Sequence, residues 1–226
     1  MITSNMLLSD IATALRGDVV HLQRHVAGRY AEMECGHRRN GKGVLTQCGE
    51  WTSPAGVQWL YVLIISTTRT ILYPMAWYFT REGIHGIQLE AKGPLTHLRP
   101  HVLDQYRDRF CPDVSVMVAL RQLHWRNYDK ASGPHAYQGK PGIASAVVDG
   151  YLMGNMLYND TVVRMHTFYD MEMGMKRPDL REMRQLVEWR RYYGAMSPKA
   201  INADTGDYLN WGRGFPLRLA RQRRAA

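Results

Sequence analysis

Several features that this chain lacks argue against whole classes of protein, before any motif is considered. Cysteine is scarce, because the 226 residues include only 3 cysteines, widely spaced and odd in number: Cys35, Cys48 and Cys111. Such a set is a poor disulfide framework and favours a reducing cytoplasm. The longest apolar run, Trp59 to Ile65, is too short to cross a bilayer. Residues 1–8 have no cationic start before an apolar run, so we expect no secretory signal and no membrane partner.

The common signatures of cofactor chemistry are also missing. The chain has no phosphate-binding P-loop, no GxGxxG dinucleotide fingerprint and no serine nucleophile elbow. Its aspartates are scattered, which gives little support to a carboxylate cage for magnesium. Cys35, His37 and Cys48 offer three ligands for zinc, but no CxxC pair and no evident fourth ligand accompany them. We therefore expect no cofactor, and zinc at these three residues stays open as an alternative.

Basic residues outnumber acidic ones. The chain has 29 lysines and arginines against 20 aspartates and glutamates, a formal charge of +9 and a pI of about 9.6. The last 14 residues, from Arg213 to Ala226, contribute five arginines and no acid, so the rest of the chain carries only +4. A basic balance favours polyanionic partners, and we expect RNA or a nucleotide. A homo-oligomer and a protein partner for the arginine-rich tail stay open.

Hydrophobic periodicity predicts the secondary structure. Residues 5–36 repeat apolar side chains at intervals of three and four, which is typical of a helix, capped by Ser9 and interrupted at Gly17. Further helices are expected at residues 100–110, 114–125 with Asp113 as cap, and from Pro178 to about Tyr193. Strands are expected at 58–66, at 70–80 with Pro74 at an edge or bulge, and at 84–90, 143–157 and 161–169. Asp149-Gly150 can divide the 143–157 strand, and residues 36–56 and 127–141 are expected to be loops or, for 36–56, a ragged hairpin.

The order of these elements predicts the fold class. Strands and helices are grouped along the chain, and they do not alternate one for one. This favours an α+β fold in which helices pack on an antiparallel β-sheet, with an N-terminal helical segment and a C-terminal helix. We expect three parts: a helical segment and loop at residues 1–50, an α+β core domain at 51–194, and a basic tail at 195–226.

The expected helix at residues 100–110 is the first candidate for chemistry. A proline opens it, and His101, Gln105 and Arg109 are spaced by four, so they share one face. An imidazole can accept or donate a proton near neutral pH, and a guanidinium can hold two phosphate oxygens. Metal-free RNA cleavage needs a base, an acid and a cation of this kind. An exposed histidine beside a solvated arginine is the plainer interpretation of the same spacing.

The strand expected at residues 161–169 is the second candidate. Strict alternation places Arg164, His166 and Phe168 on one face and Met165, Thr167 and Tyr169 on the other. A strand with arginine and histidine on one face can complete a phosphate site opposite His101. A half-exposed edge strand with a polar outer face explains the pattern at least as well.

These two segments together resemble a known group of enzymes. The residues Pro100-His101, Gln105-Tyr106 and Arg109-Phe110 resemble a pattern of RelE/barnase-EndoU-like toxin nucleases, roughly His-x-x-x-Arg-x-x-x-Arg. In that superfamily a second helix follows, and then strands ending in a segment like Val-x-x-x-Thr-Phe, to which Val163 to Phe168 is similar. The resemblance covers about residues 84–175. It implies an α+β core and metal-free RNA cleavage, with His101 as acid or base, Arg109 as phosphate clamp and Thr167 or its strand neighbours in the site.

One residue departs from that pattern, because Gln105 stands where the superfamily has its first arginine. Glutamine can bond a phosphate but cannot neutralise it, so Arg107 or Arg164 would have to substitute. We expect a cytoplasmic ribonuclease of the bacterial or phage toxin or effector type. Its expected catalytic residues are His101, Arg109 and His166, and its expected substrate contacts are Gln105, Arg107, Arg164, Thr167 and Tyr169.

Two other functions stay open at this stage. The first is a phage or mobile-element protein that binds nucleotides or nucleic acid without cleavage and acts against host defence. Gln105 and the basic tail favour it. The second is an assembly protein whose arginine-rich tail docks on a partner.

Overall fold

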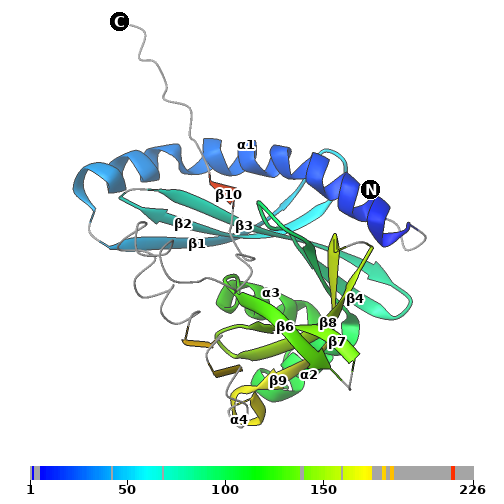
Figure 1. Ribbon diagram of the computed structural model, residues 1–226. Helices are drawn as coiled ribbons and strands as arrows, with labels where there is room; N and C mark the ends of the chain where they lie inside the picture. The colour runs from blue at the N-terminus through cyan, green and yellow to red at the C-terminus, as the bar shows by residue number, and fades with distance from the viewer. Residues whose placement is uncertain are drawn as a thin grey trace, which may run out of the picture.

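The described strands form a single sheet with helices on both faces. The computed structural model describes residues 2, 6–41, 43–67, 69–137, 140–158, 160–174, 180, 181, 184, 185, 215 and 216. The elements are α1 (Leu8–Asn40), β1 (Val44–Thr52), β2 (Gln58–Ser66), β3 (Thr70–Thr80), β4 (Gly83–Gln88), β5 (Leu95–Leu98), α2 (Pro100–Phe110), α3 (Val116–Arg126), β6 (Ala131–Tyr137), β7 (Lys140–Ala146), β8 (Gly150–Leu157), β9 (Val162–Asp170), α4 (Met171–Gly174) and β10 (Phe215–Pro216). Figure 1 shows α1 above the sheet and α2 and α3 below it. The expected α+β class with a mostly antiparallel sheet is confirmed.

The strand order joins two antiparallel meanders at one parallel pair. The order is β1-β2-β3-β4-β5-β9-β8-β7-β6, and the short β10 pairs with β3 off this path. All neighbouring pairs are antiparallel except β5 and β9, in which Leu95 lies opposite Val162 and Leu98 opposite Met165. α2 and α3 follow β5 directly in the chain. β9, which carries Arg164 and His166, and α2, which carries His101, therefore both lie where the two meanders join.

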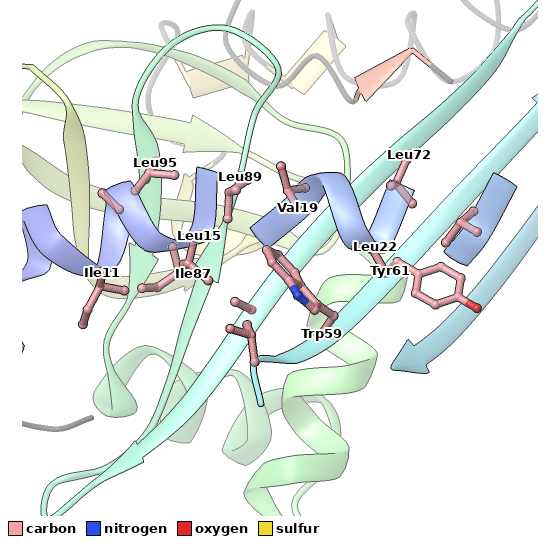
Figure 2. Close-up of a cluster of buried hydrophobic side chains, with 14 of the residues drawn as sticks. Ile11, Leu15, Val19, Leu22, Trp59, Tyr61, Leu72, Ile87, Leu89 and Leu95 are labelled. Atoms are coloured by element: carbon pink, nitrogen blue, oxygen red, sulfur yellow. The ribbon is translucent and has the colours of Figure 1, made fainter. Parts of the chain in front are cut away.

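α1 is one uninterrupted helix, so the predicted break at Gly17 is wrong. Its apolar stripe packs on one face of the sheet, where Leu15 and Leu22 are fully buried. Figure 2 shows this stripe beside Ile87, Leu89 and Leu95. A Cβ placed on Gly17 would meet nothing within 4 Å, so this glycine lies on the outer side of the helix. A glycine there costs only about 1 kcal/mol, less than burial of the stripe contributes.

The opposite face of the sheet is covered by α2 and α3. Val102, Leu103 and Tyr106 of α2 are fully buried there, and Phe110 stacks on Tyr106 although 39% of it is exposed. The N-cap of α3 is Ser115, which accepts a bond from the Val118 amide, and the expected Asp113 cap is wrong. Ser115 lies two positions after Asp113 and has the extended backbone conformation of an N-cap residue.

Four strands were not predicted as strands, namely β1, β5, β6 and the two-residue β10. β1 lies within residues expected to be a loop or a ragged hairpin, begins inside the expected N-terminal segment, and pairs with β2 along its whole length. β5 has only four residues, and β6 is rich in residues with low β-propensity. These strands form because each pairs with a neighbouring strand. In β6, for example, Ala131 lies opposite Ala146 of β7. The division at Asp149-Gly150 is confirmed, because β7 ends at Ala146 and β8 begins at Gly150.

Pro74 lies inside β3, between β2 and β4, so its expected edge or bulge position is wrong. It faces Tyr61 of β2 in regular register. Its carbonyl accepts a bond from the Leu89 amide, so its nitrogen also points to the side of β4. β4 ends at Gln88, and the missing N–H therefore falls just past the end of that strand.

The expected C-terminal helix from Pro178 to about Tyr193 lies mostly outside the described residues. Leu180, Arg181, Arg184 and Gln185 are helical, and Leu180 is buried. The expected tail at residues 195–226 also lies outside them, apart from β10.

Candidate functional site

α2 contacts β9 through two of the residues singled out in the sequence. Gln105 Oε1 accepts bonds from Thr167 Oγ1 and from the Phe168 amide, both at 2.7 Å. Arg109 Nη1 donates to the Phe168 carbonyl, and its Nε lies 3.8 Å from Asp170 Oδ2. β5 ends opposite Met165, and no other described strand pairs with that edge of β9 beyond this point. Gln105 and Arg109 thus supply the bonds that a neighbouring strand would have made.

A register shift in β9 occurs at His166. Gly154 of β8 lies opposite Met165, and Met153 lies opposite Thr167, so His166 is the extra residue of a β-bulge. A bulge of this kind re-aims side chains, and such features are frequent beside functional sites. The shift also overturns the alternation expected along the strand, because Phe168 joins Met165 in the buried core under α2.

His101 lies exposed in the first turn of α2. The helix runs in the same direction as β9, since Gln105 contacts Thr167 and Phe168 while Arg109 contacts Phe168 and Asp170. Four helical residues rise about 6 Å, which equals about two strand residues. By this rise the backbone of His101 is level with residues 165–166 of β9.

Two arginines act on His166. Arg164 lies two residues before it on β9, and Arg99 is the N-cap residue of α2. Burial, and then the positive charges of Arg99 and Arg164, lower the pKa of His166 below its ordinary value. All three residues are half-buried. The combination is an imidazole held neutral beside two guanidiniums, at the junction of the two meanders.

Sequence reasoning missed a stack of rings on the neighbouring strands. Tyr78 of β3 stacks on His85 of β4 at 5.1 Å between ring centres, and His85 stacks on His97 of β5 at 5.2 Å. Burial, followed by the charges of His85 and Arg164, lowers the pKa of His97 to about 3. Side chains alternate between the two faces of a strand, so the sequence predicts that His85 and Ile87 share a face. The position of His97 was not, because β5 was not predicted.

The other predicted substrate contacts do not gather around His166. Arg107 bonds Asp108 at 3.0 Å and lies 3.7 Å from Asp104, all on α2. Tyr169 packs with a small cluster around Tyr151, on the sheet face opposite Phe168. Thr167 is buried and bonded to Gln105, as described above. Arg164 and His166 are thus the predicted site residues that the structure brings together with Arg99.

The zinc alternative finds no support in the described part of the chain. There, no group of three or more histidine, cysteine, aspartate or glutamate side chains could hold a metal ion. His37 Nε2 lies 3.3 Å from the Gly43 carbonyl, and Cys35 and Cys48 are both exposed free cysteines.

Comparison of the chain with protein-family models, with curated proteins and with solved structures finds no match. The resemblance to toxin nucleases therefore stays a prediction from the motif residues. Among the described helices, none is both long and apolar enough to span a membrane.

Proposed function

We propose that this protein is a metal-independent ribonuclease with His166, Arg99 and Arg164 at its centre. The observation that carries the proposal is the environment of His166, an imidazole at a bulge with two guanidiniums acting on it. Arg164 takes the role that the motif resemblance assigned to Arg109, whose guanidinium bonds the backbone of β9. The enzyme would act on cytoplasmic RNA, as a toxin or effector of a bacterium or phage.

The chemistry follows from the charges of these three residues. The lowered pKa keeps His166 unprotonated at neutral pH, so its imidazole can accept the proton of a ribose 2′-OH. Arg99 and Arg164 supply positive charge where the transition state gains negative charge on the phosphate oxygens. His101, exposed in the first turn of α2, is the candidate acid for the departing 5′-oxygen.

RNA cleavage in the presence of EDTA tests the proposal. We expect wild-type protein to degrade a labelled RNA, and His166→Asn to lower the rate at least about 100-fold, the usual contribution of a general base. His21→Asn is the matched control, because His21 is exposed on α1. Intact RNA after incubation with folded wild-type protein, or equal loss in both variants, would refute the proposal.

A second candidate function is nucleic-acid binding without cleavage. Gln105 and Arg109 favour it, because the structure uses both side chains to bond β9. In this case folded protein retains RNA on a filter but leaves it intact, and Arg164→Gln weakens retention while His166→Asn does not. A steep loss of binding with added salt would identify the phosphate backbone as the ligand.

A further inference from the structure

Three polar residues form a row across the centre of the sheet. His97 of β5 lies opposite Arg164 of β9, and Arg164 lies opposite Asn155 of β8. Directly opposed residues project from the same face of a sheet, with Cβ atoms about 5 Å apart. The three side chains therefore stand side by side on the face that also carries Leu95 and Val162. We call them the His97–Arg164–Asn155 row.

Each member of the row has a buried polar atom that bonds nothing. These atoms are His97 Nδ1, Arg164 Nε and Asn155 Oδ1. His97 is only 4% exposed, so water reaches its ring poorly. A buried polar atom without a partner destabilises the fold, because it has lost its hydrogen bonds to water. Three in adjacent register positions indicate a missing ligand rather than three separate defects.

A chain of hydrogen bonds makes His97 Nδ1 a donor. Thr80 Oγ1 accepts from the Glu82 amide at 3.1 Å and lies 2.9 Å from His85 Nε2. His85 Nδ1 lies 2.9 Å from His97 Nε2. When Thr80 donates to His85 Nε2 and His85 Nδ1–H donates to His97 Nε2, the Thr80 hydroxyl and the His85 ring N–H both have acceptors. The remaining proton of the neutral His97 ring is then on Nδ1, in the direction of the row.

The positive charge of the row favours the binding of an anion. Arg164 makes no ion pair within 4 Å with any described carboxylate, although its Nε is buried. The other groups whose charge acts on His97 are also basic, namely His85, Arg99 and His166. A half-buried guanidinium without a counter-ion is costly, and a tetrahedral oxyanion satisfies it together with a neighbouring N–H donor. The Asn155 amide can turn to present its NH₂ group to the same ligand.

We propose that the His97–Arg164–Asn155 row binds a phosphate group, that of an RNA chain held beside His166. His97 Nδ1–H and the Arg164 guanidinium donate to its oxygens, and the Asn155 amide donates from the next strand. The assignment to RNA rests on the proposed ribonuclease function. The binding of a phosphate group by the row does not rest on that function, because binding requires no cleavage.

Calorimetry with full-length protein tests the site using inorganic phosphate, a nucleoside 3′-monophosphate and a 2′-O-methyl RNA that cannot be cleaved. We expect all three to bind, the nucleotide and the RNA more tightly than phosphate. Arg164→Lys keeps the charge but loses the fork of donors, so affinity should fall about tenfold or more. Arg121→Lys is the control, because Arg121 pairs with Glu50 at the surface. Equal affinity for phosphate and nucleotide would overturn the assignment to RNA.

A measurement on wild-type protein covers the case in which a variant fails to fold. Imidazole ¹⁵N spectra should show His97 protonated on Nδ1, and its Nδ1 resonance should shift on addition of phosphate. A proton on Nε2, or no shift and no heat with any of the three ligands, would overturn the phosphate site.

The two proposals fail separately. His166→Asn should abolish RNA cleavage and retain phosphate binding. RNA cleavage by a protein that binds no phosphate would overturn the row while sustaining the ribonuclease. Phosphate binding without RNA cleavage would sustain the phosphate site at the row and overturn the ribonuclease.

Discussion

At the scale of single residues, Asp149 joins three elements. Its carboxylate accepts a bond from Tyr106 of α2 at 2.8 Å, two bonds from Arg126 of α3, and one from Asn127 at 2.9 Å. Burial by itself raises the pKa of Asp149, but the bonds from Arg126, Asn127 and Tyr106 outweigh it and hold the pKa below its ordinary value. One side chain in the β7–β8 turn thus fixes α2, and with it the candidate site, against the sheet.

Asp149→Ala should destabilise the fold by about 2–4 kcal/mol, because it leaves the buried Tyr106 hydroxyl and Asn127 amide unpaired. Urea denaturation measures the change. Asp108→Ala serves as the control, since Asp108 is exposed and its pairing with Arg107 contributes at most about 1 kcal/mol. Similar losses in the two variants would contradict this role of Asp149.

A buried histidine makes the fold sensitive to acid. Burial lowers the pKa of His124 to about 3, the nearby charge of Lys130 adds to this, and a bond to the Tyr73 carbonyl opposes it. The unfolded chain therefore takes up a proton at this residue below about pH 6.5, and the folded chain does so only near pH 3. The free energy of unfolding should fall through this window as the pH falls, by up to about 1.4 kcal/mol per pH unit.

Denaturation curves recorded across that pH window check this expectation. His124→Leu should flatten the dependence, whereas His21→Leu on the exposed side of α1 should not. His97, with a pKa also near 3, contributes with the same sign, so part of the slope remains in His124→Leu. An unchanged slope in that variant would contradict the assignment.

At the scale of elements, glycines have opposite roles in α1 and in β8. Gly17 in the middle of α1 has open space where a side chain would be. Gly154, beside the bulge of β9, has the Arg164 carbonyl 2.0 Å from an added Cβ. Gly17 has a low helix propensity, but the packing of α1 on the sheet outweighs this cost. Gly154 permits the close approach of β8 to β9 at the bulge that contains His166.

Gly17→Ala should therefore stabilise the protein by about 0.5–1 kcal/mol, because alanine loses less backbone freedom in a helix. Gly154→Ala should destabilise it by about 1–3 kcal/mol, because the added methyl group meets backbone. Thermal unfolding of the two variants provides the comparison. A stabilising effect at Gly154 would show that the two strands can separate there without cost.

At the scale of the whole molecule, charge is unevenly distributed along the chain. The five arginines beyond residue 212 account for more than half of the net charge of +9. Such a segment adds sequence-independent attraction to a polyanion. The proposed site at Arg99, Arg164 and His166 has its cations at the start of α2 and on β9. The arginines beyond residue 212 and the proposed site should therefore contribute differently to RNA binding.

Glutamine at Arg218, Arg221, Arg223 and Arg224 should lower the slope of log affinity against log salt by up to about 3, if all four contact a single strand. Cleavage at saturating RNA should be retained, because the centre is untouched. Filter binding at several salt concentrations measures the slope, and Arg24→Gln with Arg39→Gln on α1 is the control. An unchanged slope would show that the tail does not contact RNA.

The elements with strong local signals could be predicted from the amino-acid sequence. The apolar stripe of α1, the dense β-branched run of β2 and the proline start of α2 each follow from side-chain periodicity or backbone chemistry, which act over a few residues. The His166 and Arg164 pair was found in the same way. Only the tertiary structure decided that β5 lies beside β9, that β9 has a bulge at His166, and that Gln105 and Arg109 bond the edge of β9. Pairing between strands far apart in the chain leaves no periodic signal, so the row of His97, Arg164 and Asn155 emerged only from the fold.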